Sequence, residues 1–394
     1  MKTKAITSVL LNKGRLYYIA GYMLPVLSVF INTIFLAWYF SDEEFAKFAI
    51  YESYLLFQAI VIAMGMDKGV LRFYEDSKLN IRFCVRFSLL VSLLSCFIIW
   101  LLTDDFTVSL CLTCCGISLS VQQLVSAVYQ KKGDAFSYLR VRTVFFFCGV
   151  ASIVILYATE TKSAAGKYLF DCVLFFLFLI YALPDLSKHF SLKKTESQEH
   201  DFLKYSVPFV PALLVSWFFW TSPRLMIEEW WGVDEVGLYT IAQRLCSVIS
   251  LIGGIFSIRH VPLVFERLDR NLDIRSMMLR NLSLYIMSSL LLFIGLNTAV
   301  GLFYSNFEAI KEYLLFIGFG LLVSGISSLS TVPLLLGKKR SVLNLIIGIF
   351  GAILFLACSF LMHDLITAVG IVMLLCVVIL LVFFIQLFAC VYLK

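Results

Sequence analysis

The sequence predicts an all-α integral membrane protein with about twelve transmembrane helices, arranged as two six-helix bundles related by a pseudo-two-fold axis along the membrane normal. Hydrophobic residues make up 61% of the 394 residues and charged residues only 15%, whereas an ordinary soluble domain carries roughly 25% charged residues. The apolar residues fall into runs of about 20, which is the length that crosses a hydrocarbon core of about 30 Å as a helix. Basic residues gather in alternate connections between these runs.

Twelve apolar runs of membrane-spanning length are separated by charged or turn-rich breaks. The first run follows a basic N-terminal segment and is too long for a signal peptide. No small-residue cleavage site comes after it, so we expect a retained helix. The expected helices cover 16–40, 45–65, 84–102, 106–130, 143–159, 168–184, 205–228, 235–257, 281–303, 313–336, 342–361 and 367–391.

The distribution of Lys and Arg predicts the orientation, because positively charged loops resist translocation. The N-terminus, the C-terminus and the connections on their side hold 26 of the 32 basic residues. The opposite loops hold Lys47, Lys162, Lys167 and Lys311. We therefore expect a multi-pass membrane protein with both termini in the cytoplasm.

The connection 185–204 splits the twelve helices six and six, which predicts an N-terminal half over 1–203 and a C-terminal half over 204–394. A faint internal repeat supports this division: Tyr22–Pro25 resembles Tyr205–Pro208, and Glu44–Phe48 resembles Glu235–Tyr239. Because six helices return the chain to its starting side, the repeat is parallel.

One intramembrane arginine lies in the 205–228 run, where Trp217 and Arg224 share a helix face. An Arg at a helix centre costs about 2.5 to 3.5 kcal/mol on insertion scales, so it is expected to face a partner or a wet cavity. Pairing with Glu228, or snorkelling outward from the end of the helix, would also explain Arg224.

A second arginine, Arg244, lies about nine residues into the 235–257 run, roughly 13 Å deep at 1.5 Å per residue. This depth exceeds comfortable snorkelling distance. Arg244 also belongs to a polar stripe with Gln243 at helical spacing. We expect this stripe to line a cavity.

Two carboxylates are candidates for ion coupling. Glu52 occupies the repeat position that matches Gln243, although an ion pair would also explain it. Asp171 lies in the first turn of its helix, where an exposed interfacial carboxylate is the alternative. Asn32 is a candidate for lining the cavity or for hydrogen bonding between helices. Interhelical hydrogen bonding also explains the weaker stripes, which are Ser118, Gln122 and Ser126, and Ser324, Ser327, Ser328 and Thr331.

Several classes of function lack their signals in this sequence. The four His residues show no metal-ligand spacing, no phosphate-binding glycine loop with a following Lys is present, and the cysteines lie in apolar runs. The basic residues form no single face for nucleic acid. We therefore expect no catalytic residues, no metal, no cofactor and no nucleic-acid partner.

The chain resembles the Wzx-type polysaccharide repeat-unit (O-antigen) flippases of the multidrug, oligosaccharidyl-lipid and polysaccharide exporter superfamily. The resemblance covers essentially the whole chain and is carried by Tyr22–Pro25, by Asp42–Phe48, and by Asp234–Tyr239 followed by Ala242–Arg244. It implies flipping of an undecaprenyl-diphosphate-linked oligosaccharide from the cytoplasmic to the periplasmic leaflet by alternating access, as a step of lipopolysaccharide biosynthesis.

The resemblance also implies roles for the candidate residues. Arg244 and Arg224 would attract the diphosphate, while Trp217, Tyr239 and Gln243 would contact the sugars. Coupling to H+ or Na+, contact with membrane lipids, and cooperation with a polysaccharide polymerase and chain-length proteins would follow.

Two other functions fit parts of the sequence. A drug or metabolite exporter of the same superfamily would share the fold, and a cavity dominated by acids would favour it. A membrane-embedded polymerase or glycosyltransferase would need a sizeable extracytoplasmic loop with catalytic groups, which the sequence does not predict.

Overall fold

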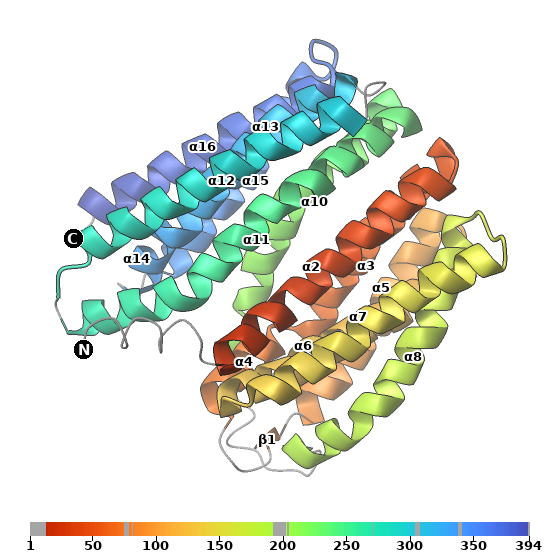
Figure 1. Cartoon of the computed structure of the whole chain (residues 1–394), viewed down its shortest axis with the longest axis horizontal. Helices are drawn as coiled ribbons and strands as arrows, with labels where there is room; N and C mark the ends of the chain where they lie inside the picture. Colours follow the sequence, from red (N-terminus) through yellow and green to blue (C-terminus); the bar gives the residue numbers. More distant parts are fainter. Residues whose placement is uncertain are drawn as a thin grey trace. The chain divides into compact units, whose positions relative to one another are not determined.

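The computed structural model of the chain is helical over nearly all of its described length (Figure 1). Its backbone divides into two compact units, Met1–Leu214 and Val215–Lys394. The structure describes residues 13–74, 79–80, 82–191, 202, 205–270, 272–303, 308–337 and 341–392.

Unit 1 contains α2 (Lys13–Tyr39), α3 (Asp42–Ala63), α4 (Met66–Phe73), α5 (Arg82–Thr103), α6 (Phe106–Lys132), α7 (Ala135–Ala158) and α8 (Ala164–His189). The division between the units falls inside α10 (Phe209–Trp231). Unit 2 continues with α11 (Val233–Asp269), α12 (Arg275–Phe303), α13 (Glu308–Leu329), α14 (Thr331–Gly337), α15 (Ser341–Met362) and α16 (Ala368–Tyr392). The domain boundary expected after residue 203 stays a prediction.

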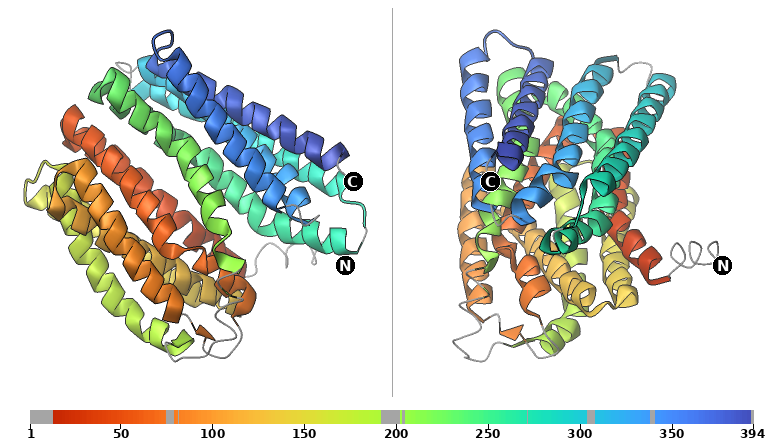
Figure 2. Two further views of the ribbon diagram at one scale, coloured as in Figure 1. Left: turned by 180° about the vertical axis from the view of Figure 1, so that it is seen from behind. Right: turned by 90° about the vertical axis from the view of Figure 1, so that its left-hand side faces the viewer.

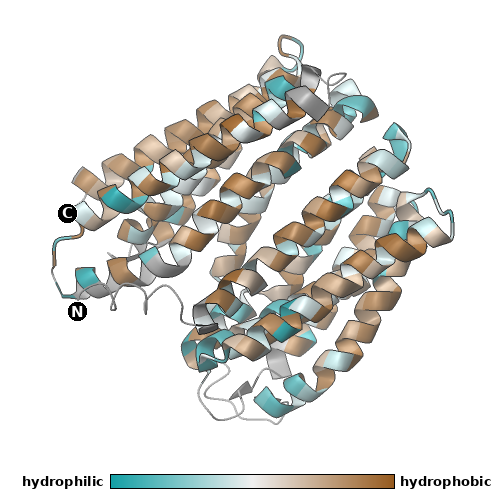
Figure 3. Ribbon diagram, in the orientation of Figure 1, coloured by the Kyte–Doolittle hydropathy of each residue, from teal (hydrophilic) through white to brown (hydrophobic). Residues whose placement is uncertain are grey.

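Twelve helical spans among the described residues are long and apolar enough to cross a membrane, which confirms the predicted fold class. Within each unit these helices run roughly along one direction (Figure 2). Hydrophobic residues cover most of their length, and hydrophilic residues gather near helix ends and connections (Figure 3).

Helix α6 occupies the centre of unit 1, where it contacts α3, α4, α5, α7 and α8. Its small and polar side chains allow close packing and hydrogen-bond to neighbouring helices. Gln58 Nε2 of α3 donates to Thr113 Oγ1 over 2.7 Å, Ser120 Oγ donates to the Ala59 carbonyl over 3.1 Å, and Ser118 Oγ donates to the Phe175 carbonyl over 3.3 Å. The predicted interhelical role of the Ser118 stripe is thus confirmed for Ser118.

Helix α13 holds the equivalent place in unit 2, where it contacts α11, α12, α14 and α16. Ser327 Oγ, near its C-terminal end, and Thr331 Oγ1, at the beginning of α14, both donate to Gln386 Oε1 of α16. This confirms interhelical bonding for that stripe. Both α6 and α13 are the fourth spanning helix of their half, as a parallel repeat requires.

Two helices begin earlier than expected, because polar caps precede the apolar runs. Asp134 accepts a hydrogen bond from the Ser137 backbone N–H and caps α7, which places Arg140 and Arg142 within the helix. Ser163 accepts from the Gly166 N–H and caps α8. Lys167, expected in an outer loop, therefore lies in the first turn of α8.

A short parallel strand pair connects the start of α5 with the end of α8 in unit 1. Strand β1 (Leu79–Asn80) precedes α5 and pairs with β2 (Phe190–Ser191), which follows α8. The start of α5 and the end of α8 therefore lie at the same end of the unit.

We expect Gly325→Ala to destabilise unit 2, because a Cβ at this position would lie 1.9 Å from the hydroxyl of buried Tyr285. Overpacking of this kind costs typically about 1–3 kcal/mol. Thermal unfolding of the purified protein measures the effect. The control is Gly295→Ala, whose Cβ would meet nothing within 4 Å; equal midpoints for the two variants would contradict the packing argument.

His260 lies in α11, beyond the membrane-spanning part of that helix. It hydrogen-bonds to α12 and α13 of unit 2. Its Nε2 donates to the Leu329 carbonyl over 2.8 Å, and its Nδ1 accepts from Asn281 Nδ2 over 2.7 Å. This arrangement fits the neutral imidazole, since Nδ1 then carries no proton. Burial lowers the pKa of His260 below its usual value of 6.5.

A lowered pKa means that the unfolded chain binds the proton more tightly than the folded chain. The contribution of neutral His260 to stability is therefore complete above the unfolded pKa and declines as the pH falls through 6.5 towards the folded pKa. We expect the unfolding midpoint of the wild type to fall more between about pH 7.5 and about pH 5.5 than that of His260→Gln, in unfolding scans at both pH values. Equal decreases of the unfolding midpoint in the two proteins would exclude His260 as the titrating group.

Candidate functional site

A cavity of about 140 Å³ lies inside unit 1 and is bordered by α2, α3, α6, α7 and α8. It contains the three predicted site residues of the N-terminal half, Asn32, Glu52 and Asp171, with Lys167 beside them. All four side chains are buried. The structure therefore brings together residues that come from three different helices.

Lys167 and Asp171 form a buried ion pair on one face of α8. The distance from Lys167 Nζ to Asp171 Oδ2 is 2.5 Å, and Lys167 Nζ also donates to Ser152 Oγ of α7 over 2.9 Å. The residues are only 2% and 6% exposed. This corrects the alternative of an exposed interfacial carboxylate for Asp171.

Two buried oxygens beside this cavity lack a hydrogen-bond partner among the described residues. Asn32 Nδ2 donates to the Ser28 carbonyl over 2.8 Å within its own helix, while Asn32 Oδ1 has no hydrogen-bond partner among the described residues. Asp171 Oδ1 also has no hydrogen-bond partner among the described residues. Such buried oxygens are suited to a bound water, proton or cation. The ion-coupling roles of Glu52 and Asp171 stay predictions.

In unit 2, Arg224 of α10 is hydrogen-bonded to Gln243 of α11. Its Nη2 donates to Gln243 Oε1 over 2.5 Å, and Gln243 Nε2 donates to the Trp220 carbonyl over 2.6 Å. Arg224 is 3% exposed, so its charge is buried. A side chain snorkelling to the membrane surface is therefore excluded.

Tyr239 lies beside this interaction, since Gln243 Nε2 also donates to its hydroxyl over 3.4 Å. Tyr239 is fully buried, donates to the Trp220 carbonyl over 3.3 Å and packs edge-on against Tyr313. Both Arg224 and Arg244 act electrostatically on Tyr239, and Arg244 is half-buried, as is Trp217. Because the Tyr239 ring is covered, a sugar contact there would require the helices to rearrange; this role stays a prediction.

Sequence reasoning missed two cations of unit 1. Lys167 was assigned to a loop, although its spacing of four residues from Asp171 is the signal of an ion pair on one helix face. Arg142 was assigned to a connection. It lies eight residues into α7, where its Nε donates to Ser126 Oγ over 3.1 Å and its guanidinium lies 5.4 Å from the centre of the Tyr138 ring. Buried charge is therefore present in both units.

In the part of the chain that the structure describes, no group of three or more His, Cys, Asp or Glu side chains could hold a metal ion. The candidate sites consist of an ion pair, further charged side chains, amides and hydroxyls.

Comparison with known proteins gives similarity at the level of structure. No protein-family model matches the chain, and no curated protein matches it in sequence. The lipid II flippase MurJ in an inward closed conformation superimposes with a TM-score of 0.68 and 14% identity, over 92% of this chain and 86% of MurJ.

Multidrug transporters share the same fold. An outward-facing MATE family transporter of the MOP superfamily gives a TM-score of 0.60 at 15% identity, over 96% of this chain and 95% of its own. The MATE multidrug transporter DinF-BH gives 0.59 at 15% identity, over 96% of this chain and 94% of its own. The chain therefore has the fold of these transporters and flippases.

We expect Lys167→Met or Asp171→Leu alone to destabilise the protein strongly, because removing one partner of a buried pair costs roughly 3 to 5 kcal/mol. The double variant Lys167→Met/Asp171→Leu should recover most of that loss. Thermal unfolding of the four proteins gives the coupling. As a control, Lys47→Met breaks the exposed pair with Glu43 and should cost at most about 1 kcal/mol. Additive single effects would refute a coupled pair.

Proposed function

We propose that this protein is a flippase that moves an undecaprenyl-diphosphate-linked oligosaccharide repeat unit from the cytoplasmic to the periplasmic leaflet by alternating access. The observation that carries the proposal is the pair of arginines in the spanning helices of unit 2. Arg224 is buried and fixed by Gln243, and Arg244, the next residue along α11, is half-buried. A diphosphate is the anionic part of such a substrate, and arginine suits phosphate recognition.

Burial strengthens this electrostatic argument. A charge in a low-dielectric membrane interior attracts a counter-ion far more strongly than a charge in water does. Gln243, whose amide also donates to the Trp220 carbonyl, holds the Arg224 guanidinium in one position, so its field is fixed. Arg244 is more exposed and is the side chain that would touch the diphosphate directly.

Ion coupling would reside in unit 1, in the cavity that contains Glu52 and Asp171. Proton or Na+ binding to a carboxylate there would weaken the attraction between Asp171 and Lys167 and bias the packing of α7 and α8. The ion would thus act on helices far along the chain from Arg224. This separation lets coupling and substrate binding be tested by different substitutions.

A cation-coupled drug or metabolite exporter is the second candidate. The observation that favours it is the pair of buried carboxylates around the unit 1 cavity, which would attract a cationic molecule. In either case the twelve spans make the protein a multi-pass membrane protein. For the flippase we further propose a bacterial inner membrane, cytoplasmic termini, and a polysaccharide polymerase and chain-length proteins as partners.

We expect the wild type to restore surface polysaccharide in a host that lacks its own repeat-unit flippase. Arg244→Ala should abolish restoration, Arg244→Lys should keep part of it, and Glu52→Gln should lower transport more than substrate binding. Polysaccharide on gels, at matched membrane expression, gives the readout. The physical reason is that Lys keeps the charge but loses the two-pronged hydrogen bonding of Arg.

The same strains separate the two candidates. Resistance to cationic drugs without restored polysaccharide, together with a silent Arg244→Ala, would support the exporter and refute the flippase. Lys311→Ala, which removes a charge near the beginning of α13 outside the proposed site, is the control and should restore polysaccharide fully.

A further inference from the structure

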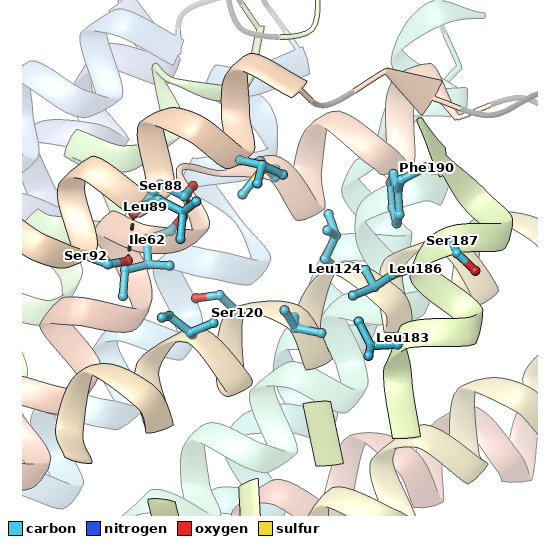
Figure 4. Close-up of a pocket in the computed structure, with 14 residues that line it drawn as sticks. Ile62, Ser88, Leu89, Ser92, Ser120, Leu124, Leu183, Leu186, Ser187 and Phe190 are labelled. Carbon is cyan, nitrogen blue, oxygen red and sulfur yellow. Dashed lines mark hydrogen bonds between the residues drawn. The ribbon is translucent and has the colours of Figure 1, made fainter. Parts of the chain in front are cut away.

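A second cavity of unit 1 lies between α5 and α8 and is separate from the polar one. It has a volume of about 440 Å³ and is floored by α6. Figure 4 shows Ile62, Leu89 and Ser92 on one side of the opening and Leu183, Leu186 and Phe190 on the other. The proposed transport mechanism does not use this cavity.

The wall of the cavity is effectively apolar although four serines border it. Ser88 Oγ donates to the Ile62 carbonyl over 2.7 Å, and Ser92 Oγ donates to the Ser88 carbonyl over 2.7 Å. Ser120 Oγ donates to the Gly116 carbonyl over 2.8 Å, and Ser187 Oγ to the Pro184 carbonyl over 2.9 Å. Every hydroxyl proton of these serines is directed to the backbone, so the wall favours hydrocarbon over water.

Membrane-spanning segments border the open side of the cavity, so we expect that side to face hydrocarbon. Leu89 and Leu183, which lie on opposite sides of the opening, are 55% and 56% exposed. Both belong to membrane-spanning segments. At the floor, Ser120 and Leu124 are each only 6% exposed. A chain that entered from the bilayer would therefore reach residues that the surrounding lipid layer cannot touch.

Positive charge lies at one end of this cavity. Exposed Arg86 follows the lining residue Val85 at the start of α5, and exposed Lys188 follows the lining residue Ser187 at the end of α8. The pairing of β1 with β2 brings these two helix ends together. A phosphate group held at this end would lie near both cations.

We propose that this cavity binds one acyl chain of an anionic membrane phospholipid, with the lipid phosphate near Arg86 and Lys188. A dry apolar cavity of about 150 Å³ accommodates one benzene, or roughly 25 Å³ per carbon. At that ratio, 440 Å³ corresponds to about 18 carbons, which is the size of one acyl chain. The proposal does not depend on the transported substrate.

The test uses the full-length protein in vesicles that contain phosphatidylglycerol with a photoactivatable group in one acyl chain. After irradiation, peptide mass spectrometry should find adducts on the α6 floor at Ser120 and Leu124. The variant Ile117→Phe/Val121→Phe fills the cavity from α6 and should lower those adducts by about fivefold or more. Adducts on exposed Val154 of α7 should not change.

Leu110→Phe is the matched control, since Leu110 lies on the same helix, is 53% exposed and does not line the cavity. It should label as the wild type does. Absence of floor adducts in the wild type, or unchanged floor adducts in the filled variant, would overturn the proposal.

Two further arms identify the lipid. The wild type should label more strongly with phosphatidylglycerol than with the matching phosphatidylcholine, and Arg86→Gln/Lys188→Gln should remove the difference. No difference in the wild type would overturn the proposed role of the cations. Displacement of the adducts by equimolar polyprenyl diphosphate would assign the cavity to a prenyl tail and overturn the phospholipid. Because no transport is measured, failure of the flippase proposal leaves this result intact.

Discussion

The membrane allows no water to satisfy a buried polar group, and this constraint organises both units. A polar side chain inside a span is stabilised by a partner on its own or a neighbouring helix, because the surrounding hydrocarbon offers none. Helix α6 shows the consequence in unit 1, where serine and threonine hydroxyls donate to backbone carbonyls of their own helix and of α3 and α8. These interactions fix the helix at the centre of the unit and leave the wall of the acyl-chain cavity apolar.

Charged groups follow the same constraint at higher cost. Lys167 is buried with Asp171 and Ser152, while Arg224 is buried against Gln243, whose amide is itself anchored on the Trp220 carbonyl. An ion pair suits a switch, because protonation of one partner removes the attraction. Arg224, in contrast, donates to the neutral amide oxygen of Gln243. The two units thus offer different chemistry.

Unit 1 separates its polar and apolar cavities by helix α6. The polar cavity is bordered by Cys115 and Leu119 of this helix, and the apolar cavity by Ile117 and Ser120. Residues on opposite faces of one helix therefore serve two environments. The proposed lipid and the proposed ion coupling would therefore share helix α6.

The sequence by itself determined the helical class, the twelve spans and the polar stripes, because apolar run length and helical periodicity are local properties of the chain. It did not determine where α7 and α8 begin, since Asp134 and Ser163 extend them through polar residues. Only the tertiary structure placed Asp171, Glu52 and Asn32 around one cavity, joined Arg224 to Gln243, and opened a space between α5 and α8. The reason is that these features depend on which helices are neighbours, and the period of a helix shows which face is polar but not what lies against that face.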